Sequence, residues 1–532
     1  MLSTKGMTLK HVASRSILVS CALAVFFCLP VSADVVLPAI FSDHMVLQAD
    51  AVVPVWGCAE PNELVTVVFG SHTKSATAKV SGKWMVKLDS LKAGEAATLI
   101  VKGKNTLVFN DVIVGEVWLC SGQSNMAWTV DHSKDAEKEV AEATHPLIRH
   151  FKVALAAAGA TADSARGVWE VCSPETAGRF SAVAYYFGRE LGQELKVPVG
   201  LLNISYGGSP VESWMSEATL RGNPAFASAF EREKQSKARY PAQQKLYEQR
   251  LAAWQAEQAA ARQAKREFTK RPPRKPTGDG VDRFTPAALY NAMLHPFIPY
   301  AVRGVIWFQG EANYLRSEEY RSLFPAMIAE WRGEFGQGDL PFYYVQLANQ
   351  ARLSDATGVQ FAFQREAQAA ALKLPNTGVA VSVDIGEANN PHFKNKQEVG
   401  RRLSLIALAN VYGRKKEWSG PVVEKIERKG PAMQVAFSHA DGLKLTGASP
   451  GGFELAGPDK VFRPAIARID GGSVVVTSDQ VTEPVALRYA WHNNPAVTLY
   501  NGAGLPASPF RSDAWPVPVP SAVRAAGGEG DE

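Results

Sequence analysis

Hydrophobic and polar residues alternate over short runs near the N-terminus of the chain. Between residues 34 and 111, the clearest strand-like runs are Val52–Trp56, Leu64–Phe69 and Lys83–Val86, and Gly, Pro and Asn residues separate them. Short runs of this kind, punctuated by turn residues, are typical of an antiparallel sandwich. We therefore expect an N-terminal β-sandwich-like domain over residues 34–111.

From residue 112 to about residue 415, strand-like, largely apolar runs alternate with helical patterns, in which apolar residues recur every three or four positions. The expected strands are Val112–Leu119, Val199–Ser205, Tyr300–Phe308, Leu340–Ala348 and Gly378–Asp384, and the expected helices are Phe180–Glu194, Arg316–Trp331, Ala362–Leu374 and Lys396–Tyr412. Strands that alternate with helices predict a doubly wound parallel α/β sheet. We assign residues 112–415 to this α/β domain.

Residues from about 221 to 280 interrupt the alternation. Tyr247, Leu251 and Trp254 recur at helical spacing in a stretch rich in Ala, Gln, Lys and Arg, and a Pro-rich basic segment follows at residues 271–276. We expect a long exposed helical insertion followed by a stiff linker. A polybasic binding site is the alternative interpretation of this stretch.

Short strand patterns return after residue 415. The clearest are Ala432–Phe437, Ser473–Thr477 and Val485–Ala490. They predict a C-terminal β-domain over residues 416–517. We expect residues 518–532, which end in Gly and acidic residues, to form a flexible tail.

The composition fits a globular protein of more than one domain. Hydrophobic residues make up 46% and charged residues 20% of the 532 positions, which excludes a mostly disordered, collagen-like or polytopic membrane protein. The net charge is +5, but residues 231–275 alone carry thirteen Lys and Arg against five Asp and Glu. Because the positive charge is concentrated there, we expect no broad nucleic-acid-binding surface.

The first 33 residues have the organisation of an export signal. A basic segment through Arg15 precedes the apolar run Ile17–Leu29, and small residues follow at 31–33. The apolar run is short for a membrane-spanning helix, and a retained anchor is the alternative. We expect residues 1–33 to be a signal peptide, the mature protein to be secreted or periplasmic, and no stable membrane insertion to remain after its removal.

Three cysteines follow the expected signal: Cys58, Cys120 and Cys172. Their number is odd and their spacing does not match a metal site. A Cys120–Cys172 disulfide and buried free thiols are both compatible with the sequence.

Small and polar residues follow three of the expected strands. They are Gly122 and Ser124 after the first strand, Gly207 and Gly208 after the second, and Gln309, Glu311 and Asn313 after the third. Ligands of doubly wound sheets bind at the carboxyl ends of the strands, so these residues are candidates for a nucleophile and an oxyanion pocket. A helix N-cap at Ser124 and a tight turn at the glycines are the structural alternatives.

The candidate general base is His392. It lies beyond the expected strand that ends at Asp384 and before the helix that Asn395 opens, on the side of the sheet where it could reach Ser124. His295, the other candidate, lies in an apolar stretch that favours a structural role.

Several segments, in their order along the chain, resemble the sialate O-acetylesterase family of SGNH (GDSL-like) hydrolases. They are Leu37–Gln48, Ser121–Met126, Gly207–Trp214, Trp307–Glu311, Leu499–Asn501 and Gly504–Arg511. The resemblance implies an SGNH-type sheet, a secreted or periplasmic location, and a serine esterase that removes acetyl groups from sialic acid or related sugars. It implies no metal and no other cofactor.

The resemblance also implies roles for single residues. Ser124 corresponds to the nucleophile, His392 to the base and Gly208 to an oxyanion donor. The Gln309–Glu311 stretch, with Asn313 just beyond it, matches a block that supplies an oxyanion amide elsewhere in the superfamily.

The acidic residue that would partner His392 in a catalytic triad is missing from its expected place. Asn389 and Asn390 occupy the positions where the family pattern has an Asp. Either a Ser–His dyad suffices, or another carboxylate serves. Asp384 and Glu387 are the nearest in sequence, and we favour Asp384.

The substrate stays open at this stage. A sialic acid carboxylate calls for a basic side chain near Ser124, for which Arg511 is a candidate, whereas a neutral glycan such as xylan or pectin calls for aromatic platforms. A non-catalytic glycan-binding protein with a degenerate hydrolase core is the third hypothesis, and the Asn389 and Asn390 departure is its only support.

Overall fold

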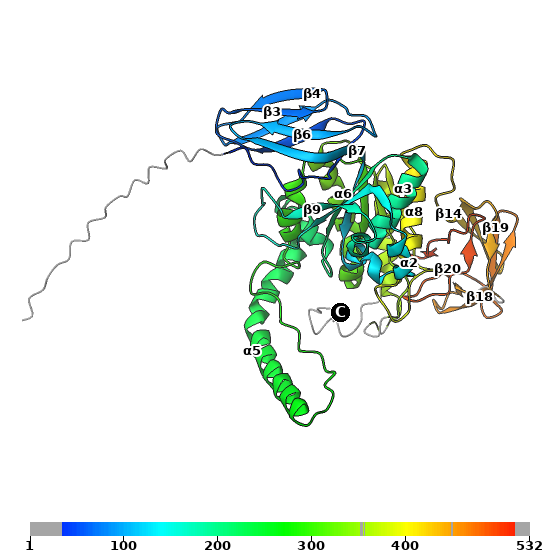
Figure 1. Cartoon of the computed structure of the whole chain (residues 1–532). Helices are drawn as coiled ribbons and strands as arrows, with labels where there is room; N and C mark the ends of the chain where they lie inside the picture. The colour runs from blue at the N-terminus through cyan, green and yellow to red at the C-terminus, as the bar shows by residue number, and fades with distance from the viewer. Residues whose placement is uncertain (1–33, 352–354, 356, 448–450, 517–532) are drawn as a thin grey trace, which may run out of the picture.

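A parallel sheet forms the centre of the molecule (Figure 1). The structure is a computed structural model that describes residues 34–351, 355, 357–447 and 451–516; the expected signal peptide and tail lie outside these residues. The order of the sheet is β13-β12-β11-β7-β10-β8-β9, and every neighbouring pair is parallel except β8 and β9. The strands are β7 (Thr106–Gly122), β8 (His145–Val153), β9 (Gly167–Cys172), β10 (Val199–Ser205), β11 (Gly304–Phe308), β12 (Phe342–Val345) and β13 (Thr377–Ala380).

Helices cover both faces of this sheet. In β11, Val305 and Trp307 join the apolar core beneath α6 (Ser317–Phe335), whereas Ile306 and Phe308 join the core shared with α3 (Ala182–Leu195) and α8 (Lys396–Asn410). Adjacent strand residues point to opposite faces, so a continuous apolar strand needs a helix on each side. The predicted doubly wound α/β sheet is confirmed. The shorter helices are α1 (Ser124–Ala127), α2 (Ala136–Ala141), α4 (Glu217–Gly222) and α7 (Gln360–Ala369).

The chain reverses its direction of travel across the sheet at β7. After β7 it builds β8, β9 and β10 on one side, with β10 next to β7, and it then crosses to build β11, β12 and β13 on the other side. Such a switch point leaves a crevice at the carboxyl ends of the two strands next to it, which is where open α/β sheets bind ligands. Ser124 lies two residues beyond the end of β7.

The N-terminal β-sheet shares a strand with the central sheet. The first half of β7 pairs with β6, and its second half pairs with β10 and β11. The 17-residue strand therefore crosses the boundary expected between residues 111 and 112. The other strands of this region are β1 (Val46–Gln48), β2 (Val53–Cys58), β3 (Leu64–Phe69), β4 (His72–Thr77), β5 (Lys83–Leu88) and β6 (Ala96–Lys102).

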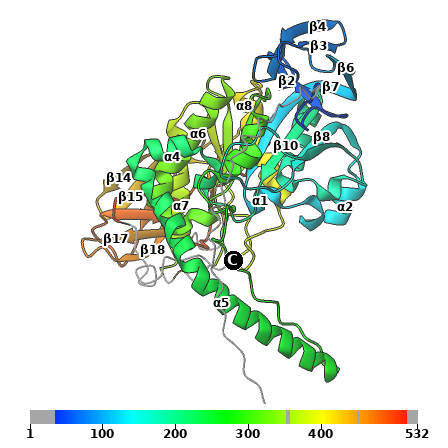
Figure 2. The same ribbon diagram turned by 90° about the vertical axis from the view of Figure 1, so that its left-hand side faces the viewer.

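A single long helix, α5 (Ala227–Gln263), forms most of the insertion. Figures 1 and 2 show it as an arm that extends away from the rest of the molecule. Only Ala229 and Ala261 of this helix are buried. The returning chain contacts the helix through Trp254, whose indole N–H donates to the Lys270 carbonyl at 2.8 Å and whose ring meets the Phe268 ring edge-on at 5.5 Å.

The C-terminal β-domain is an antiparallel sheet of order β14-β15-β19-β18-β17-β20-β22, with a separate pair, β16 and β21. It contacts α7, where the Arg365 guanidinium donates to the His492 and Asn493 carbonyls at 2.7 and 2.9 Å. The strands are β14 (Val422–Lys429), β15 (Ala432–Ser438), β16 (Lys444–Leu445), β17 (Phe453–Ala456), β18 (Phe462–Asp470), β19 (Ser473–Thr477), β20 (Ala486–Tyr489), β21 (Leu499–Tyr500) and β22 (Phe510–Arg511). Among the helices that the structure describes, none has the length and apolar character that a bilayer crossing requires.

Candidate active site

The turn after β7 needs a glycine. A side chain at Gly122, where φ is +135°, would place its Cβ 2.1 Å from the Phe308 carbonyl oxygen of β11. The next residue, Gln123, donates its backbone N–H to that same oxygen at 2.9 Å. This close approach directs the chain into α1, whose first residue is the half-buried Ser124. Within the described residues the Ser124 hydroxyl makes no hydrogen bond, so it is available to a substrate; catalytic hydrogen bonds often form only in the complex.

The turn after β10 lies against Ser124. The Cβ of Ser124 is 3.6 Å from the position that a Cβ on Gly207 would occupy, so the glycine leaves room beside the hydroxyl. Gly208 follows with φ of +70°, a conformation that L side chains rarely adopt. The Tyr206 N–H donates to the Gly122 carbonyl at 3.0 Å, which ties this turn to the end of β7.

His392 lies in the loop between β13 and α8. Its ring stacks on the Trp128 ring, with centroids 4.6 Å apart and an interplanar angle of 14°. Its backbone N–H donates to Asn390 Oδ1, and Asn390 Nδ2 donates to the His392 carbonyl, each at 3.0 Å. Asn390 Nδ2 also donates to Glu387 Oε2 at 2.9 Å. The loop conformation around His392 is thus fixed by Asn390 and Glu387.

Asn125 connects the Ser124 turn to the His392 loop. Its Nδ2 donates to the Pro391 carbonyl at 3.0 Å and to Glu311 Oε1 at 2.6 Å. Its Oδ1 accepts from Lys396 Nζ at 2.6 Å. One buried amide therefore joins the ends of β7 and β11 to the loop after β13, and it brings the segments of Ser124 and His392 together.

Lys396 is a fully buried amine beneath these segments. Its Nζ lies 3.6 Å from the centroid of the Phe393 ring. Burial lowers the pKa of Lys396 to about 7, although the nearby Glu311 and Glu387 carboxylates oppose this shift. At neutral pH, Lys396 is thus close to the midpoint of its titration.

Asp384 makes a bidentate ion pair with Arg402, with N–O distances of 2.6 and 2.8 Å. Both side chains are nearly buried. Both carboxylate oxygens of Asp384 thus accept hydrogen bonds from the Arg402 guanidinium. The structure connects Glu387, rather than Asp384, to the His392 loop through Asn390.

The polar block after β11 forms a buried hydrogen-bond network. Gln309 Nε2 donates to Asn313 Oδ1 at 2.7 Å and to the Ser209 carbonyl at 3.2 Å. Asn313 Oδ1 also accepts from the Val211 N–H at 3.0 Å, and Asn313 Nδ2 donates to Glu212 Oε2 at 2.9 Å. Both amide side chains are at most 1% exposed. They hold the loops after β10 and β11 against each other.

Glu212, which sequence reasoning did not single out, anchors this network. Burial would raise the pKa of Glu212, but the Arg316 and Arg232 guanidiniums outweigh that effect, and its pKa falls to about 2. Arg316 and Arg232 pair with Glu212 Oε1 at 2.8 and 2.9 Å. Glu212 lies two residues after Pro210 in a short turn, and nothing in this local sequence indicates its role.

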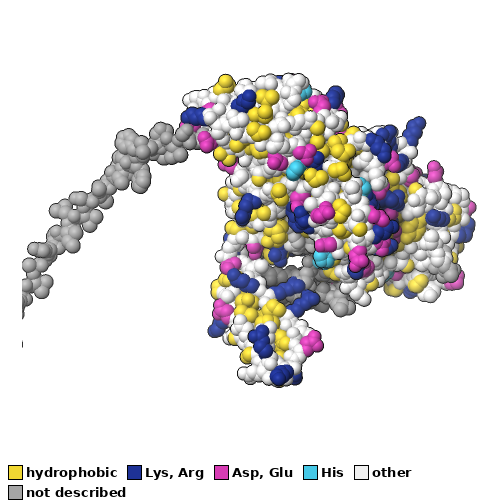
Figure 3. All heavy atoms as spheres, in the orientation of Figure 1, with side chains coloured by type: hydrophobic (Ala, Val, Ile, Leu, Met, Phe, Trp, Pro, Cys, Tyr) yellow, Lys and Arg dark blue, Asp and Glu magenta, His cyan; other side chains and the backbone are white. Residues whose placement is uncertain are grey.

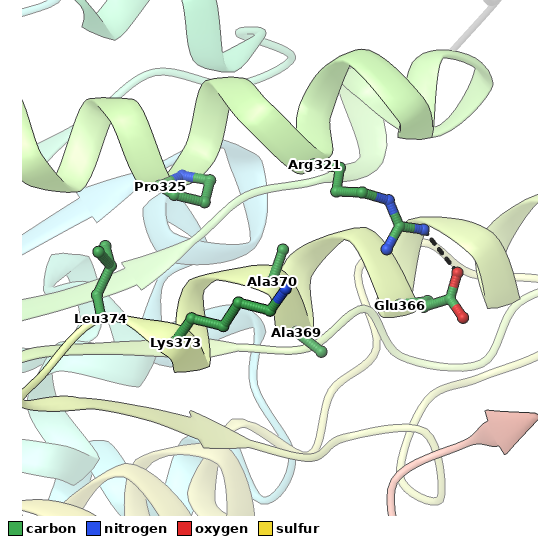
Figure 4. A pocket seen from close by; sticks show the side chains of 7 residues that line it. All are labelled: Arg321, Pro325, Glu366, Ala369, Ala370, Lys373 and Leu374. Atoms are coloured by element: carbon green, nitrogen blue, oxygen red, sulfur yellow. Dashed lines mark hydrogen bonds and ion pairs between the residues drawn. The ribbon is translucent and has the colours of Figure 1, made fainter.

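Arg511 is occupied by internal partners. Its guanidinium pairs with Glu366 at 2.8 and 2.9 Å and with Asp513 at 3.3 Å, and its side chain is 10% exposed. Glu366 also pairs with Arg321 at 2.6 Å at the edge of a surface pocket of about 410 Å³ between α6 and α7 (Figure 4). The lining of this pocket is Arg321, Pro325, Glu366, Ala369, Ala370, Lys373 and Leu374, and includes none of the predicted catalytic residues.

The remaining candidates have structural surroundings. His295 Nδ1 lies 3.1 Å from the Ala162 carbonyl in an apolar turn. The three cysteines in the described residues are free thiols, so the disulfide considered between Cys120 and Cys172 is absent. Burial raises the pKa of Cys172 to about 12, which leaves it unreactive. In the described part of the chain, no three His, Cys, Asp or Glu side chains gather as metal ligands would.

Comparison with known proteins gives one consistent result. The family described as "Carbohydrate esterase, sialic acid-specific acetylesterase" matches residues 114–266 and 277–409. The chain is 30% identical to the sialate O-acetylesterase of Rattus norvegicus, over 88% of this chain and 92% of the relative, and 29% identical to that of Homo sapiens, over 88% and 91%. A solved carbohydrate acetylesterase from Xanthomonas citri shares 36% identity with a TM-score of 0.77, over 90% of this chain and all of that one.

Proposed function

Because the chain belongs to the carbohydrate esterase family of sialic acid-specific acetylesterases, we propose that it removes O-acetyl groups from sialic acids through a serine nucleophile, Ser124. The observation that carries this proposal is the convergence of three segments at the switch point of the sheet. The Gly207-Gly208 turn lies against Ser124, and the His392 loop is joined to the Ser124 turn by Asn125 and by the stacking of Trp128 on His392.

The mechanism follows from the groups at this point. Ser124 Oγ attacks the acetyl carbonyl while His392 accepts its proton, and the backbone N–H groups of Ser124 and Gly208 stabilise the developing oxyanion. His392 then protonates the departing sugar oxygen. Water attacks the acetyl-enzyme, with His392 again as base, and releases acetate.

In this proposal the contacts of its own loop, rather than Asp384, orient the His392 ring. Arg402 engages both oxygens of Asp384, so this carboxylate is a poor candidate for the third triad member. Trp128 covers one face of the imidazole, and Asn390 fixes the backbone on both sides of it. These contacts restrict the ring without charge from Asp384.

Gln309, Glu311 and Asn313 act as positioning residues in this proposal. Their hydrogen bonds hold the loops after β7, β10 and β11 together. Gln123 also helps to hold the loops after β7 and β11 together, since its Oε1 accepts from the Ala312 N–H at 3.2 Å. The oxyanion pocket thus consists of backbone donors, and side chains hold those donors in place.

The proposal extends to the location of the enzyme. The basic and apolar segments of residues 1–33 support export and removal of this signal. The N-terminal sequence of the protein recovered from the medium or periplasm checks this; export predicts a start close to residue 34.

The experiment measures acetate release from O-acetylated N-acetylneuraminic acid and from acetylxylan, side by side. We expect release from the sialic acid by the wild type and loss of at least about 10³-fold in Ser124→Ala, because this substitution removes the attacking hydroxyl. Ser71→Ala, in the exposed turn between β3 and β4, is the matched control and retains full activity. Release from acetylxylan alone would contradict the sialic acid assignment, and an active Ser124→Ala would contradict the serine mechanism.

A further inference from the structure

Arg283 lies beside the glycine turn of the proposed site. Its Nε is 3.4 Å from the position that a Cβ on Gly208 would occupy. Its guanidinium carbon lies 4.5 Å from the centroid of the Phe284 ring and 5.8 Å from that of Tyr206. Arg283 Nε is buried and has no hydrogen-bond partner, and no described carboxylate pairs with this side chain.

This lack of a partner distinguishes Arg283 from the other arginines around the sheet ends. Arg316 and Arg232 pair with Glu212, Arg402 pairs with Asp384, and Arg511 pairs with Glu366. A guanidinium N–H withdrawn from water without an acceptor costs free energy. An external carboxylate would satisfy it, since carboxylate and guanidinium match in bidentate geometry.

The position of Arg283 suits a substrate that also reaches Ser124. Gly207 lies against Ser124, and the next residue, Gly208, lies against Arg283. Two successive Cα atoms are only about 3.8 Å apart. One ligand can therefore present an acetyl ester to the hydroxyl and an anionic group to the guanidinium.

The surrounding charge favours an anionic ligand. Arg283 follows directly on the insertion, and residues 231–275 of that insertion carry an excess of eight positive charges. Lys and Arg side chains recur along the projecting α5 arm in Figure 3. A basic arm next to the site raises the local concentration of anionic substrates.

We propose that Arg283 binds the carboxylate of an acidic sugar and thereby selects acidic over neutral O-acetylated sugars. The inference rests on the proposed esterase function and deepens it, because it names the residue that recognises the acid. Arg511, the arginine that the sequence suggested for this task, is engaged by Glu366 and Asp513.

The test compares kcat/KM for O-acetylated N-acetylneuraminic acid with kcat/KM for its carboxyl methyl ester, which keeps the acetyl group but removes the negative charge. We expect the wild type to favour the acid by about tenfold or more, as a charge-assisted hydrogen bond would give. Arg283→Gln should bring this ratio close to one, chiefly through KM for the acid. Arg283→Lys, which keeps a point charge, should retain part of the preference.

Arg428→Gln removes an exposed arginine of β14 in the C-terminal β-domain and is the matched control, which should keep the wild-type ratio. A wild-type ratio near one, or an unchanged ratio in Arg283→Gln, would overturn the inference while leaving the esterase function intact. A wild type that is inactive on both esters would instead contradict the proposed function, and this inference with it.

Discussion

The ends of β7 and β11 are neighbours in the sheet, with Gly122 paired to Phe308, but their polar residues serve different purposes. After β7, Ser124 is half-buried and keeps its hydroxyl free of other described residues. After β11, Gln309 and Asn313 are buried; Gln309 donates to Asn313, and Asn313 donates to Glu212. Polar residues at a strand end thus predict a site only in part. Whether their hydrogen-bonding capacity is used internally decides which of them can react.

The largest effect should come from His392. We expect His392→Ala to lower kcat/KM by about 10⁴-fold or more, because Ser124 loses the base that accepts its proton. His295→Ala is the matched control, since it removes the other candidate histidine from its contact with Ala162, and its folded fraction should keep near-normal kcat. An active His392→Ala enzyme would contradict the assignment of the base.

Asn313→Ala tests whether Asn313 only positions the loops or itself donates a hydrogen bond to the oxyanion. We expect the free energy of unfolding, measured in urea, to fall by about 2–4 kcal/mol, because Glu212, Gln309 and the Val211 N–H lose a buried partner. The kcat of the folded variant should fall less than about tenfold, whereas loss of an oxyanion donor costs about 10²–10³-fold.

Asn110→Ala, on an exposed side chain, is the control for Asn313→Ala and should change the free energy of unfolding by less than about 0.5 kcal/mol. A stable Asn313→Ala protein with a 10²-fold lower kcat would contradict this account, because it would show that Asn313, after β11, takes part in catalysis rather than in positioning.

Arg511→Gln tests whether an arginine that is paired within the protein, unlike Arg283, contributes to recognition of the substrate carboxylate. We expect the free energy of unfolding to fall by about 1–3 kcal/mol, because Glu366 and Asp513 lose a guanidinium partner. The kcat/KM ratio between acid and methyl ester should stay at the wild-type value. A collapse of that ratio in Arg511→Gln would move carboxylate recognition away from Arg283.

Lys396 predicts a pH dependence of stability. Burial lowers its pKa from 10.5 to about 7 in the folded protein, so between these values the unfolded state binds more protons. The free energy of unfolding therefore gains up to about 1.4 kcal/mol per pH unit from this group as the pH rises from 7 towards 10. Urea unfolding of wild type and Lys396→Met across this range measures the difference. Equal slopes in the two proteins would show that Lys396 does not titrate there.

The sequence predicted the apolar strands of the central sheet better than the strands that carry charged side chains. β10 was expected at its observed bounds because four of the seven residues of Val199–Ser205 are Val, Leu or Ile. No strand was expected at β8, since Arg149, His150 and Lys152 break the apolar pattern. The buried Arg149 is satisfied by the His44 and Asp111 carbonyls, each at 3.1 Å, and such long-range partners are not visible in a local pattern.

The close approach of the Ser124 turn and the Gly207-Gly208 turn was predictable, because both turns follow the carboxyl ends of expected parallel strands. The site was not predictable where a distant partner decides the role. Arg402, 18 residues after Asp384, engages its carboxylate, and Glu366 engages Arg511 across 145 residues. The role of Asn125 likewise depends on Pro391 and Lys396, which meet it only in the folded chain.

Covalent labelling by a serine-directed phosphonate tests the central claim most directly. We predict that one equivalent of the reagent inactivates the enzyme and that mass spectrometry finds it on the peptide carrying Ser124. Labelling should slow strongly in His392→Ala and remain normal in His295→Ala. An active, fully inhibitable enzyme in which the reagent modifies a different residue would contradict the account.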